Sequence, residues 1–285
     1  MRGNVKEDEG HRKKRKFEGK IIVITGASSG IGRQAALDFV NKGAGPIILI
    51  ARSESKLLEL KKTLQVFTKS KAAEIVAYTC DISKKEDVLI MGTHILERFG
   101  YIDLLINNAG FGEFGKVENQ SIEQIEAVVR TNYFGMVYCI KVFLHSMLSR
   151  HSGHIVNVAS LAASFGVAGM AGYCASKYAM LGFSESLYHE LYGTGVRITV
   201  VSPIGVKTNF FNNQSFENHN PNYTGFMLES RTVSKAILAA ANSSRLEIIV
   251  PFYVRAGVWF KHTLPYAINP VAGALFRRQL NKAPK

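Results

Sequence analysis

The feature that most constrains the fold of this chain is a regular alternation between short apolar runs and longer segments with helical periodicity. The runs are too short for helices and are rich in β-branched residues, which is typical of strands buried on both faces. Strands are predicted at 21–24, 47–50, 74–79, 104–106, 155–158 and 197–201. Helices are predicted from Ile31 to a stop near Gly43, and near 53–68, 84–99, 121–149 and 172–192.

This alternation predicts an α/β fold, a Rossmann-type doubly wound parallel sheet of about seven strands with helices on both faces. No internal repeat or linker interrupts the pattern, and 285 residues suit one large domain. We expect a disordered basic leader at 1–17 and the folded domain at 18–250. That domain includes a substrate loop at about 205–230. A C-terminal extension at 251–285 is expected to pack peripherally or at an interface.

The formal net charge of +13 would suit a nucleic-acid-binding protein if it were spread over the folded domain. Residues 1–20 hold eight Lys and Arg against four acids, and residues 246–285 hold six against one. The two ends therefore supply nine of the thirteen charges. No nucleic-acid recognition motif accompanies them, so we expect no nucleic-acid partner.

The N-terminus and the cysteines bear on the cellular compartment. The basic leader has no apolar segment beside it and is not a secretory signal. No stretch approaches the roughly 20 apolar residues that a transmembrane helix needs. Cys80, Cys139 and Cys174 form no CxxC pair, which argues against a disulfide framework or a metal site. We expect a cytoplasmic protein without a bound metal.

The first predicted strand runs into the sequence TGASSGIG at 25–32 and then into a helix. Glycines allow a tight turn there and let backbone N–H groups approach a pyrophosphate at the positive end of the helix. Such a turn also occurs without a ligand, but its place between a strand and a helix favours a dinucleotide site. The contacts predicted in this turn are Gly26, Ser28, Ser29, Gly30, Ile31 and Gly32.

The end of the second predicted strand distinguishes NAD from NADP. An acid there would bond the ribose 2′-hydroxyl of NAD, whereas an arginine accommodates the 2′-phosphate of NADP. The chain has Ala51-Arg52-Ser53. A guanidinium and a hydroxyl suit a phosphate dianion, although a solvated arginine at a helix start is the alternative. We expect NADP(H), with Arg52 and Ser53 as contacts.

Tyr173 and Lys177 are four residues apart in a predicted helix and therefore lie on one face of it. A nearby ammonium favours the phenolate and lowers the pKa of a tyrosine from about 10 toward the range that a general acid/base needs. Chance matches to YxxxK are common and are mostly solvated helix faces. The pair therefore needs support from other positions.

Two further polar residues supply that support. Ser160 follows the fifth predicted strand at its carboxyl end, where open parallel sheets bind ligands, and its hydroxyl could bond a substrate oxygen. Asn132 lies inside the predicted helix at 121–149, which is costly for a residue that prefers caps. It is either an exposed helical asparagine or an interruption that holds a water or orients Lys177.

In order and spacing, these segments resemble the short-chain dehydrogenase/reductase family over about residues 18–208. The matching motifs are TGxxxGxG at 25–32, NNAG at 107–110, Asn132, Ser160 and YxxxK at 173–177. The resemblance implies that hydride passes between a nicotinamide and a carbinol or carbonyl carbon while Tyr173 moves the proton. It also implies that Ser160 positions the substrate oxygen, Lys177 holds the nicotinamide ribose, and Asn132 helps to relay protons.

The resemblance implies further cofactor contacts besides Tyr173 and Lys177. They are Asp81 and Ile82 at the adenine, Asn108, Ala109 and Gly110 beside the cofactor, and Pro203, Val206 and Thr208 near the nicotinamide. The family commonly shows PGxVxT after the sixth strand, whereas this chain has PIGVKT at 203–208. Ile204 replaces the usual glycine, which leaves the backbone path there open.

The substrate, direction and partners are inferred more indirectly. Cellular NADP(H) is usually kept reduced, so we expect reduction of a carbonyl. An apolar pocket cover, and hence a lipophilic ketone or aldehyde, is suggested by Phe210, Phe211, Phe216, Tyr223, Phe226 and Met227. The alternative is a non-catalytic NADP(H)-binding sensor on the same fold.

Relatives are commonly homodimers or homotetramers that pair through the two long helices. The C-terminal segment places aromatic residues beside Arg255 and Lys261, which suits peripheral association with a membrane. The alternative for this segment is packing against its own domain or a partner subunit.

Overall fold

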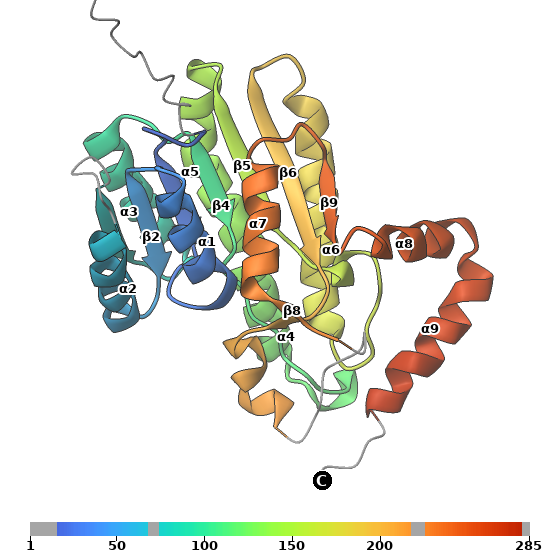
Figure 1. Cartoon of the computed structure of the whole chain (residues 1–285). Helices are drawn as coiled ribbons and strands as arrows, with labels where there is room; N and C mark the ends of the chain where they lie inside the picture. The colour runs from blue at the N-terminus through green and yellow to red at the C-terminus, as the bar shows by residue number, and fades with distance from the viewer. Residues whose placement is uncertain (1–15, 68–73, 218–225, 281–285) are drawn as a thin grey trace, which may run out of the picture.

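The computed structural model describes residues 16–67, 74–217 and 226–280. Its main feature is one parallel sheet of seven strands in the order β3-β2-β1-β4-β5-β6-β9 (Figure 1). The strands are β1 (Ile22–Thr25), β2 (Ile47–Ala51), β3 (Ile75–Thr79), β4 (Leu104–Asn107), β5 (Gly153–Val158), β6 (Val196–Pro203) and β9 (Glu247–Val250). The predicted fold class, a Rossmann-type doubly wound sheet, is confirmed.

Helices cover both faces of the sheet, and each face has its own core. One face packs against α1 (Gly30–Asn41), α2 (Glu54–Phe67) and α7 (Ser230–Ala240). The other packs against α3 (Lys85–Phe99), α5 (Gly135–Ser149) and α6 (Ala171–Glu190). In β1, Ile22 and Ile24 enter the first core while Val23 enters the second. This alternation follows from the period of two in a strand and explains why the strands are apolar throughout.

The helix predicted at 121–149 is interrupted in the structure. It consists of α4 (Ile122–Val129), a π-helical turn (Arg130–Phe134) and α5. Asn132 lies at the centre of the turn and is fully buried. Of the two alternatives for Asn132, an exposed helical residue is wrong, because the π-turn directs its side chain into the protein.

The described parts of the expected substrate loop, 206–217 and 226–229, contain a short two-stranded pair. The strands β7 (Val206–Lys207) and β8 (Leu228–Glu229) pair in parallel. Two 3₁₀ turns, Asn209–Asn212 and Gln214–Phe216, follow β7. Tyr223 of the expected pocket cover lies outside the described residues, as do residues 1–15 of the expected leader. Phe17, at the end of that leader, is buried and meets Phe39 edge-on, with ring centres 5.0 Å apart.

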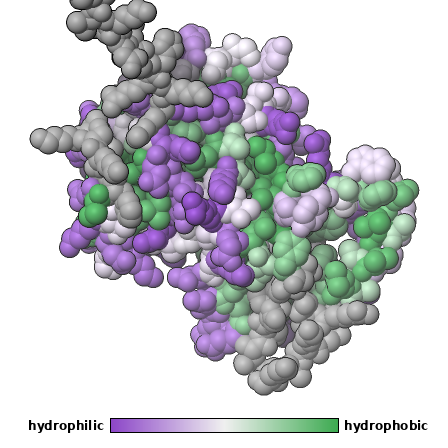
Figure 2. All heavy atoms as spheres, viewed as in Figure 1, coloured by the Kyte–Doolittle hydropathy of each residue, from purple (hydrophilic) through white to green (hydrophobic). Residues whose placement is uncertain are grey.

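The described part of the C-terminal extension is helical from 254 to 280, which the sequence analysis did not predict. It comprises α8 (Val254–Thr263) and α9 (Pro265–Leu280), which we call the C-terminal arm. The arm follows β9, the edge strand of the sheet, and projects beyond that edge (Figure 1), while Lys261 of α8 and Leu280 of α9 contact the body. The face of the molecule in Figure 2 is mostly apolar or neutral where the arm lies. Within the described ranges, no helix is both long and apolar enough to span a membrane.

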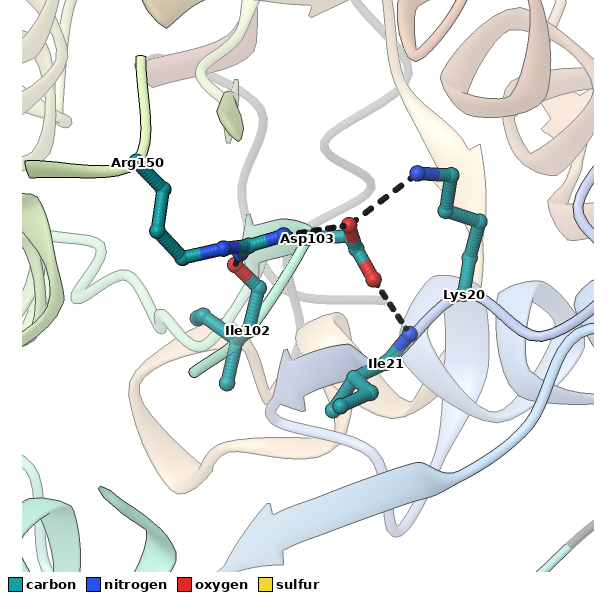
Figure 3. Close-up of polar contacts among 5 residues, drawn as sticks. All are labelled: Lys20, Ile21, Ile102, Asp103 and Arg150. Carbon is teal, nitrogen blue, oxygen red and sulfur yellow. Dashed lines mark hydrogen bonds and ion pairs between the residues drawn. The ribbon is translucent and has the colours of Figure 1, made fainter. Parts of the chain in front are cut away.

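Asp103 joins β1 to β4 at the amino end of the sheet (Figure 3). Its carboxylate accepts hydrogen bonds from the backbone of Ile21 and from the Lys20 ammonium, each at 3.0 Å. The Arg150 guanidinium lies 3.6 Å from the same carboxylate and also donates to the carbonyl of Ile102. These contacts hold β1 and β4 together at their amino ends. The glycine-rich turn follows the opposite, carboxyl end of β1.

Candidate active site

The glycine-rich turn between β1 and α1 is built so that larger residues would not fit. Gly26 and Gly30 have positive φ angles of 64° and 52°, which favour glycine. A Cβ on Gly26 would lie 2.7 Å from the Cα of Ala109. A Cβ on Gly32 would clash with the carbonyl of Gly26 and lie 2.6 Å from the side-chain nitrogen of Asn108. Because no side chain fits at Gly26 and Gly32, the turn packs tightly against the end of β4 and its backbone N–H groups can approach a pyrophosphate.

Asn108 holds the turn against the end of β4. Its side-chain nitrogen donates to the carbonyl oxygens of Thr25, at 3.0 Å, and Gly26, at 3.3 Å. The hydroxyl of Thr25 in turn accepts from the backbone N–H groups of Asn108 and Ala109. Asn108 thus positions the groove wall through its neighbours.

A polar groove runs along the carboxyl ends of β1, β2 and β4 and encloses about 420 Å³. The predicted contacts that line it are Gly26, Ser28, Ser29, Gly30, Ile31, Arg52, Ser53, Asp81, Ile82, Asn108, Ala109, Gly110 and Thr208. Lining residues that the sequence analysis did not name are Ile50, Lys56, Cys80, Phe111, Thr131 and Asn209, together with Ala51, which it did not count as a contact, and Phe210, which it expected in the pocket cover. The predicted contacts that are not part of this lining are Gly32, Tyr173, Lys177, Pro203 and Val206.

The end of the groove beyond β2 is positively charged. Arg52 and Lys56 both line it, together with the hydroxyl-bearing Ser53. Lys56 could have been indicated by its place in the first turn of α2, directly after the end of β2 that carries Arg52. Glu54, in the first turn of the same helix, is exposed and does not line the groove.

Asp81 and Ile82 line the groove after β3. One carboxylate oxygen of Asp81 accepts from the backbone N–H of Ser83, at 3.1 Å, and from its hydroxyl, at 2.8 Å. This local turn sets the direction of the carboxylate. Ile82 packs closely on Gly135: a Cβ on Gly135 would lie 2.7 Å from the Cδ1 of Ile82.

A second, apolar cavity of about 170 Å³ adjoins the groove. The two share Ile31, Thr208 and Phe210 as lining residues. The remaining lining is mostly apolar: Ala159, Ser160, Leu161, Ala162, Phe165, Val167, Met170, Tyr173, Pro203, Ile204, Gly205, Val206, Phe211 and Phe276. Pro203 and Val206, predicted near the nicotinamide, therefore lie on the wall of this cavity. Phe276 comes from α9, which the sequence analysis did not connect with the site.

The chain continues regularly past Ile204, where the family commonly has glycine. The backbone N–H of Ile204 donates to the carbonyl of Val250 at 3.0 Å, so the pairing of β6 with β9 extends through it. Its side chain is buried and lines the apolar cavity. The hydroxyl of Thr208 accepts from the N–H of Phe210 at 3.2 Å and begins the next turn.

Tyr173 and Ser160 lie on the wall of the apolar cavity. Burial raises the pKa of Tyr173 above its ordinary value, and a hydrogen bond with the Ser160 side chain lowers that pKa in part. The Ser160 hydroxyl also accepts from the N–H of Ala162 at 3.1 Å. The phenol ring meets Phe210 edge-on, with ring centres 5.3 Å apart.

The expected lowering of the Tyr173 pKa by Lys177 is not found. The Lys177 nitrogen lies 5.6 Å from the centre of the Tyr173 ring and donates to the carbonyl of Val158 at 3.0 Å. Lys177 is itself buried, which lowers the pKa of its amine to about 7. Desolvation is the leading cause of both pKa shifts, and it favours the neutral form of each group.

Asn132 connects the wall of the groove to α6. Its side-chain oxygen accepts from the N–H of Phe111 at 3.0 Å, and its nitrogen donates to the Phe111 carbonyl at 2.9 Å. The same nitrogen donates to the hydroxyl of Ser176 at 2.9 Å. A Cβ on Gly110 would lie 2.9 Å from the Asn132 oxygen and 3.6 Å from the Lys177 nitrogen. Asn132 and Lys177 therefore approach each other behind Gly110.

A glycine-rich turn at a helix N-terminus, a polar groove and an adjoining apolar cavity define a dinucleotide-binding oxidoreductase. The family model described as short chain dehydrogenase matches residues 20–219. The chain belongs to the short-chain dehydrogenase family, and it is an oxidoreductase acting on CH–OH groups with NAD or NADP.

Individual relatives agree with this assignment. Epidermal retinol dehydrogenase 2 from Mus musculus is 32% identical over 250 residues, which cover 87% of this chain and 79% of that protein. A short chain dehydrogenase/reductase from Burkholderia phymatum, solved in complex with NAD, is 27% identical, with a TM-score of 0.77 and coverage of 94% and 97%. A metagenomic short-chain oxidoreductase solved in complex with NADP is also 27% identical, with a TM-score of 0.69 and coverage of 82% and 97%.

Proposed function

We propose that the protein reduces a lipophilic ketone or aldehyde to the alcohol with NADPH. The observation that carries this proposal is the junction of the two cavities at Ile31, Thr208 and Phe210. We take the apolar cavity beside this junction as the substrate site and the groove as the dinucleotide site, and Tyr173 and Ser160 line the cavity.

The preference for NADP(H) is supported by the charge at the outer end of the groove. Arg52 and Lys56 offer two cations there, and Ser53 offers a hydroxyl. A 2′-phosphate dianion would satisfy these groups, whereas a ribose 2′-hydroxyl would leave both cations without a partner of opposite charge.

The groove residues would hold the dinucleotide, whose nicotinamide would supply a hydride for the carbonyl carbon of the substrate. Tyr173 donates its proton to the substrate oxygen, and Ser160 donates a hydrogen bond to the same oxygen. The raised pKa of Tyr173 keeps the phenol protonated, as a proton donor must be. Lys177 does not line the groove, but its nitrogen lies 3.6 Å from where a Cβ on Gly110 would stand, and we propose that it contacts the nicotinamide ribose. Asn132 is assigned to positioning the wall at Phe111.

The lipophilic character of the substrate is supported by the cavity wall. Phe165, Phe210, Phe211 and Phe276 all line it. Burying apolar substrate area against such a wall is favourable by about 25 cal/mol for each Å². One relative is named as a retinol dehydrogenase, and retinol is a lipophilic alcohol.

The proposed function is tested by following NADPH oxidation with a panel of lipophilic and short polar carbonyl compounds. Turnover is expected with the lipophilic members, and Tyr173→Phe should lose about 100-fold or more in kcat while its dissociation constant for NADPH stays the same. Nearly normal activity in Tyr173→Phe would rule out the assigned mechanism. NADPH binding without turnover on any carbonyl would favour the non-catalytic sensor.

We further propose that the protein is cytoplasmic and attaches to an anionic lipid surface through the C-terminal arm. Trp259 and Phe260 are 59% and 47% exposed on α8, and Tyr266 is 95% exposed on α9. Residues 251–280 contain no Asp or Glu, so the basic residues among them give this surface a net positive charge. Aromatic residues beside cations suit the interface of a membrane with acidic headgroups.

The lipid proposal is tested by sedimentation with vesicles that contain phosphatidylserine. The intact chain should sediment with them, and a Trp259→Ser/Phe260→Ser variant should not. Tyr192→Ser is the matched control, because Tyr192 is 91% exposed but follows α6, outside the arm. An intact chain that stays in the supernatant would contradict the proposal.

A homodimer or homotetramer is proposed on the side of α4, α5 and α6. Ile122, Phe134 and Tyr188 are exposed apolar residues on these helices and the π-turn between α4 and α5. Light scattering of the purified protein decides between a monomer, a dimer and a tetramer. A monomeric mass at micromolar concentration would contradict this proposal.

A further inference from the structure

Lys261 links the C-terminal arm to the segment that carries Ser160. It lies on α8, a helix with no buried residue. Its ammonium donates to the carbonyl of Ser164 and, at 2.7 Å, to the hydroxyl of Tyr178 on α6. Lysines are mostly exposed in proteins, whereas the Lys261 ammonium is bonded to two other elements of the fold.

The first contact is made to a structured turn. Ser160, the 3₁₀ turn Leu161–Ala163 and Ser164 follow one another directly. Ser164 is buried, and its N–H donates to the carbonyl of Leu161 at 2.9 Å. The carbonyl that Lys261 binds is therefore part of the same turn that begins at the Ser160 hydroxyl.

Besides its two hydrogen bonds, Lys261 contacts a ring on the wall of the apolar cavity. The Lys261 nitrogen lies 5.3 Å from the ring centre of Phe165 and 5.4 Å from that of Tyr178. Phe165 lines the apolar cavity. An ammonium within about 6 Å of an aromatic ring centre can be attracted to the ring face, and partial burial strengthens that attraction. Lys261 thus contacts the ring of Phe165 as well as the backbone beside it.

We propose that Lys261 is a positioning residue that holds the 160–165 segment, and with it the Ser160 hydroxyl, in the geometry needed to bind the substrate oxygen. This inference rests on the proposed role of Ser160. Loss of the ammonium frees the Ser164 carbonyl and the Phe165 ring together, so the Ser160 hydroxyl loses its fixed position at the reacting end of the cavity. The C-terminal arm thereby takes part in the reaction through one side chain.

The test compares Lys261→Met, which keeps the length of the side chain but not its charge, with Lys261→Arg and Lys235→Met. Lys235 is an exposed lysine on α7 and is the matched control. Lys261→Met should lower kcat about tenfold, because small displacements of reacting groups are costly. Its dissociation constant for NADPH should stay the same. Lys261→Arg should keep most of the activity, and Lys235→Met should keep all of it.

A double-mutant cycle separates positioning from a general effect on the fold. In a Ser160→Ala background, Lys261→Met should cause little further loss of kcat, because its effect passes through Ser160. A full additional loss in that background would overturn the proposal, as would an unchanged kcat in Lys261→Met alone.

A readout that needs no turnover keeps this test independent of the proposed function. Hydrogen exchange of a peptide covering 160–166 should be faster in Lys261→Met than in the wild type and in Lys235→Met. If the wild type reduces no carbonyl compound, the proposed function fails while this measurement still decides whether Lys261 holds the segment. Unchanged exchange would overturn the inference.

Discussion

The amine nitrogen of Lys177 lies 5.6 Å from the centre of the Tyr173 ring and donates its hydrogen bond to the carbonyl of Val158. A lysine in this position is expensive, since burial lowers the pKa of its amine to about 7. Burying Lys177 therefore destabilises the fold, and we attribute its presence to its role in the site.

Replacement of Lys177 should therefore stabilise the protein while removing its activity. Between about pH 7 and the ordinary lysine pKa, the unfolded chain binds a proton that folded Lys177 does not, so this group makes the wild type more stable as pH rises. Lys177→Met lacks this penalty, which a fall of the pKa from 10.5 to about 7 sets at about 4 kcal/mol at pH 7 and about 2 kcal/mol at pH 9, and should raise the free energy of unfolding by that amount less the lost hydrogen bond to Val158. Urea unfolding at pH 7 and pH 9 tests this, and the gain should shrink at the higher pH.

Arg52 should determine the choice of cofactor. Arg52→Asp should lower the ratio of kcat/KM for NADPH over NADH by about 10- to 100-fold, since hydrogen bonds to charged groups contribute about 1.5–3 kcal/mol. Arg231→Asp, at an exposed position on α7, is the control for the change in net charge. An unchanged ratio in Arg52→Asp would show that Arg52 is a solvated residue.

Gly32 should tolerate no side chain, whereas Gly182 should benefit from one. A Cβ on Gly32 would clash with the carbonyl of Gly26, so Gly32→Ala should weaken NADPH binding and destabilise the fold by about 1–3 kcal/mol. Gly182 is exposed inside α6 and has nothing within 4 Å of such a Cβ. Gly182→Ala should stabilise the fold by about 0.5–1 kcal/mol. Thermal unfolding and NADPH titration of both variants test this contrast.

His154 should make the protein less stable in mild acid. Its ring nitrogens lie 3.2 Å from the carbonyl oxygen of Ala241 and 3.0 Å from the hydroxyl of Thr199. Burial, followed by the charge of Arg197, lowers the pKa of His154 to about 4.

Between pH 6.5 and about 4, His154 is protonated in the unfolded chain but neutral in the folded protein. The free energy of unfolding therefore falls as pH falls. This group should contribute a loss of about 3 kcal/mol over that range. Unfolding measured across these pH values should show a shallower fall in His154→Gln. His94→Gln, at an exposed position on α3, should follow the wild type. Equal slopes in all three proteins would contradict the prediction.

The strands could be predicted from sequence because burial on both faces leaves a continuous apolar run. The edge strand β9 (Glu247–Val250) was not placed, since it is short and begins with a charged residue. Helices α8 and α9 were missed because their aromatic residues are exposed and give no regular apolar face.

Some residues of the site could likewise be predicted from local sequence, and others could not. Residues in the glycine-rich turn could be predicted because turn geometry is local to the sequence. Phe276 could not, because only the packing of α9 brings it to the wall that holds Tyr173. The pKa of Tyr173 could not be predicted from spacing either, because burial outweighs the neighbouring amine.

The π-turn at Arg130–Phe134 has a consequence for how this chain can change in evolution. One extra residue in a helical turn offsets the helix that follows by about 100° of rotation. The faces that α4 and α5 present to their neighbours are therefore matched only while that residue is present. Point substitutions along 122–149 change one contact each, whereas a single deletion there would rotate Cys139, Ile140 and Phe143 out of their core. This stretch should accordingly keep its exact length even where its composition drifts.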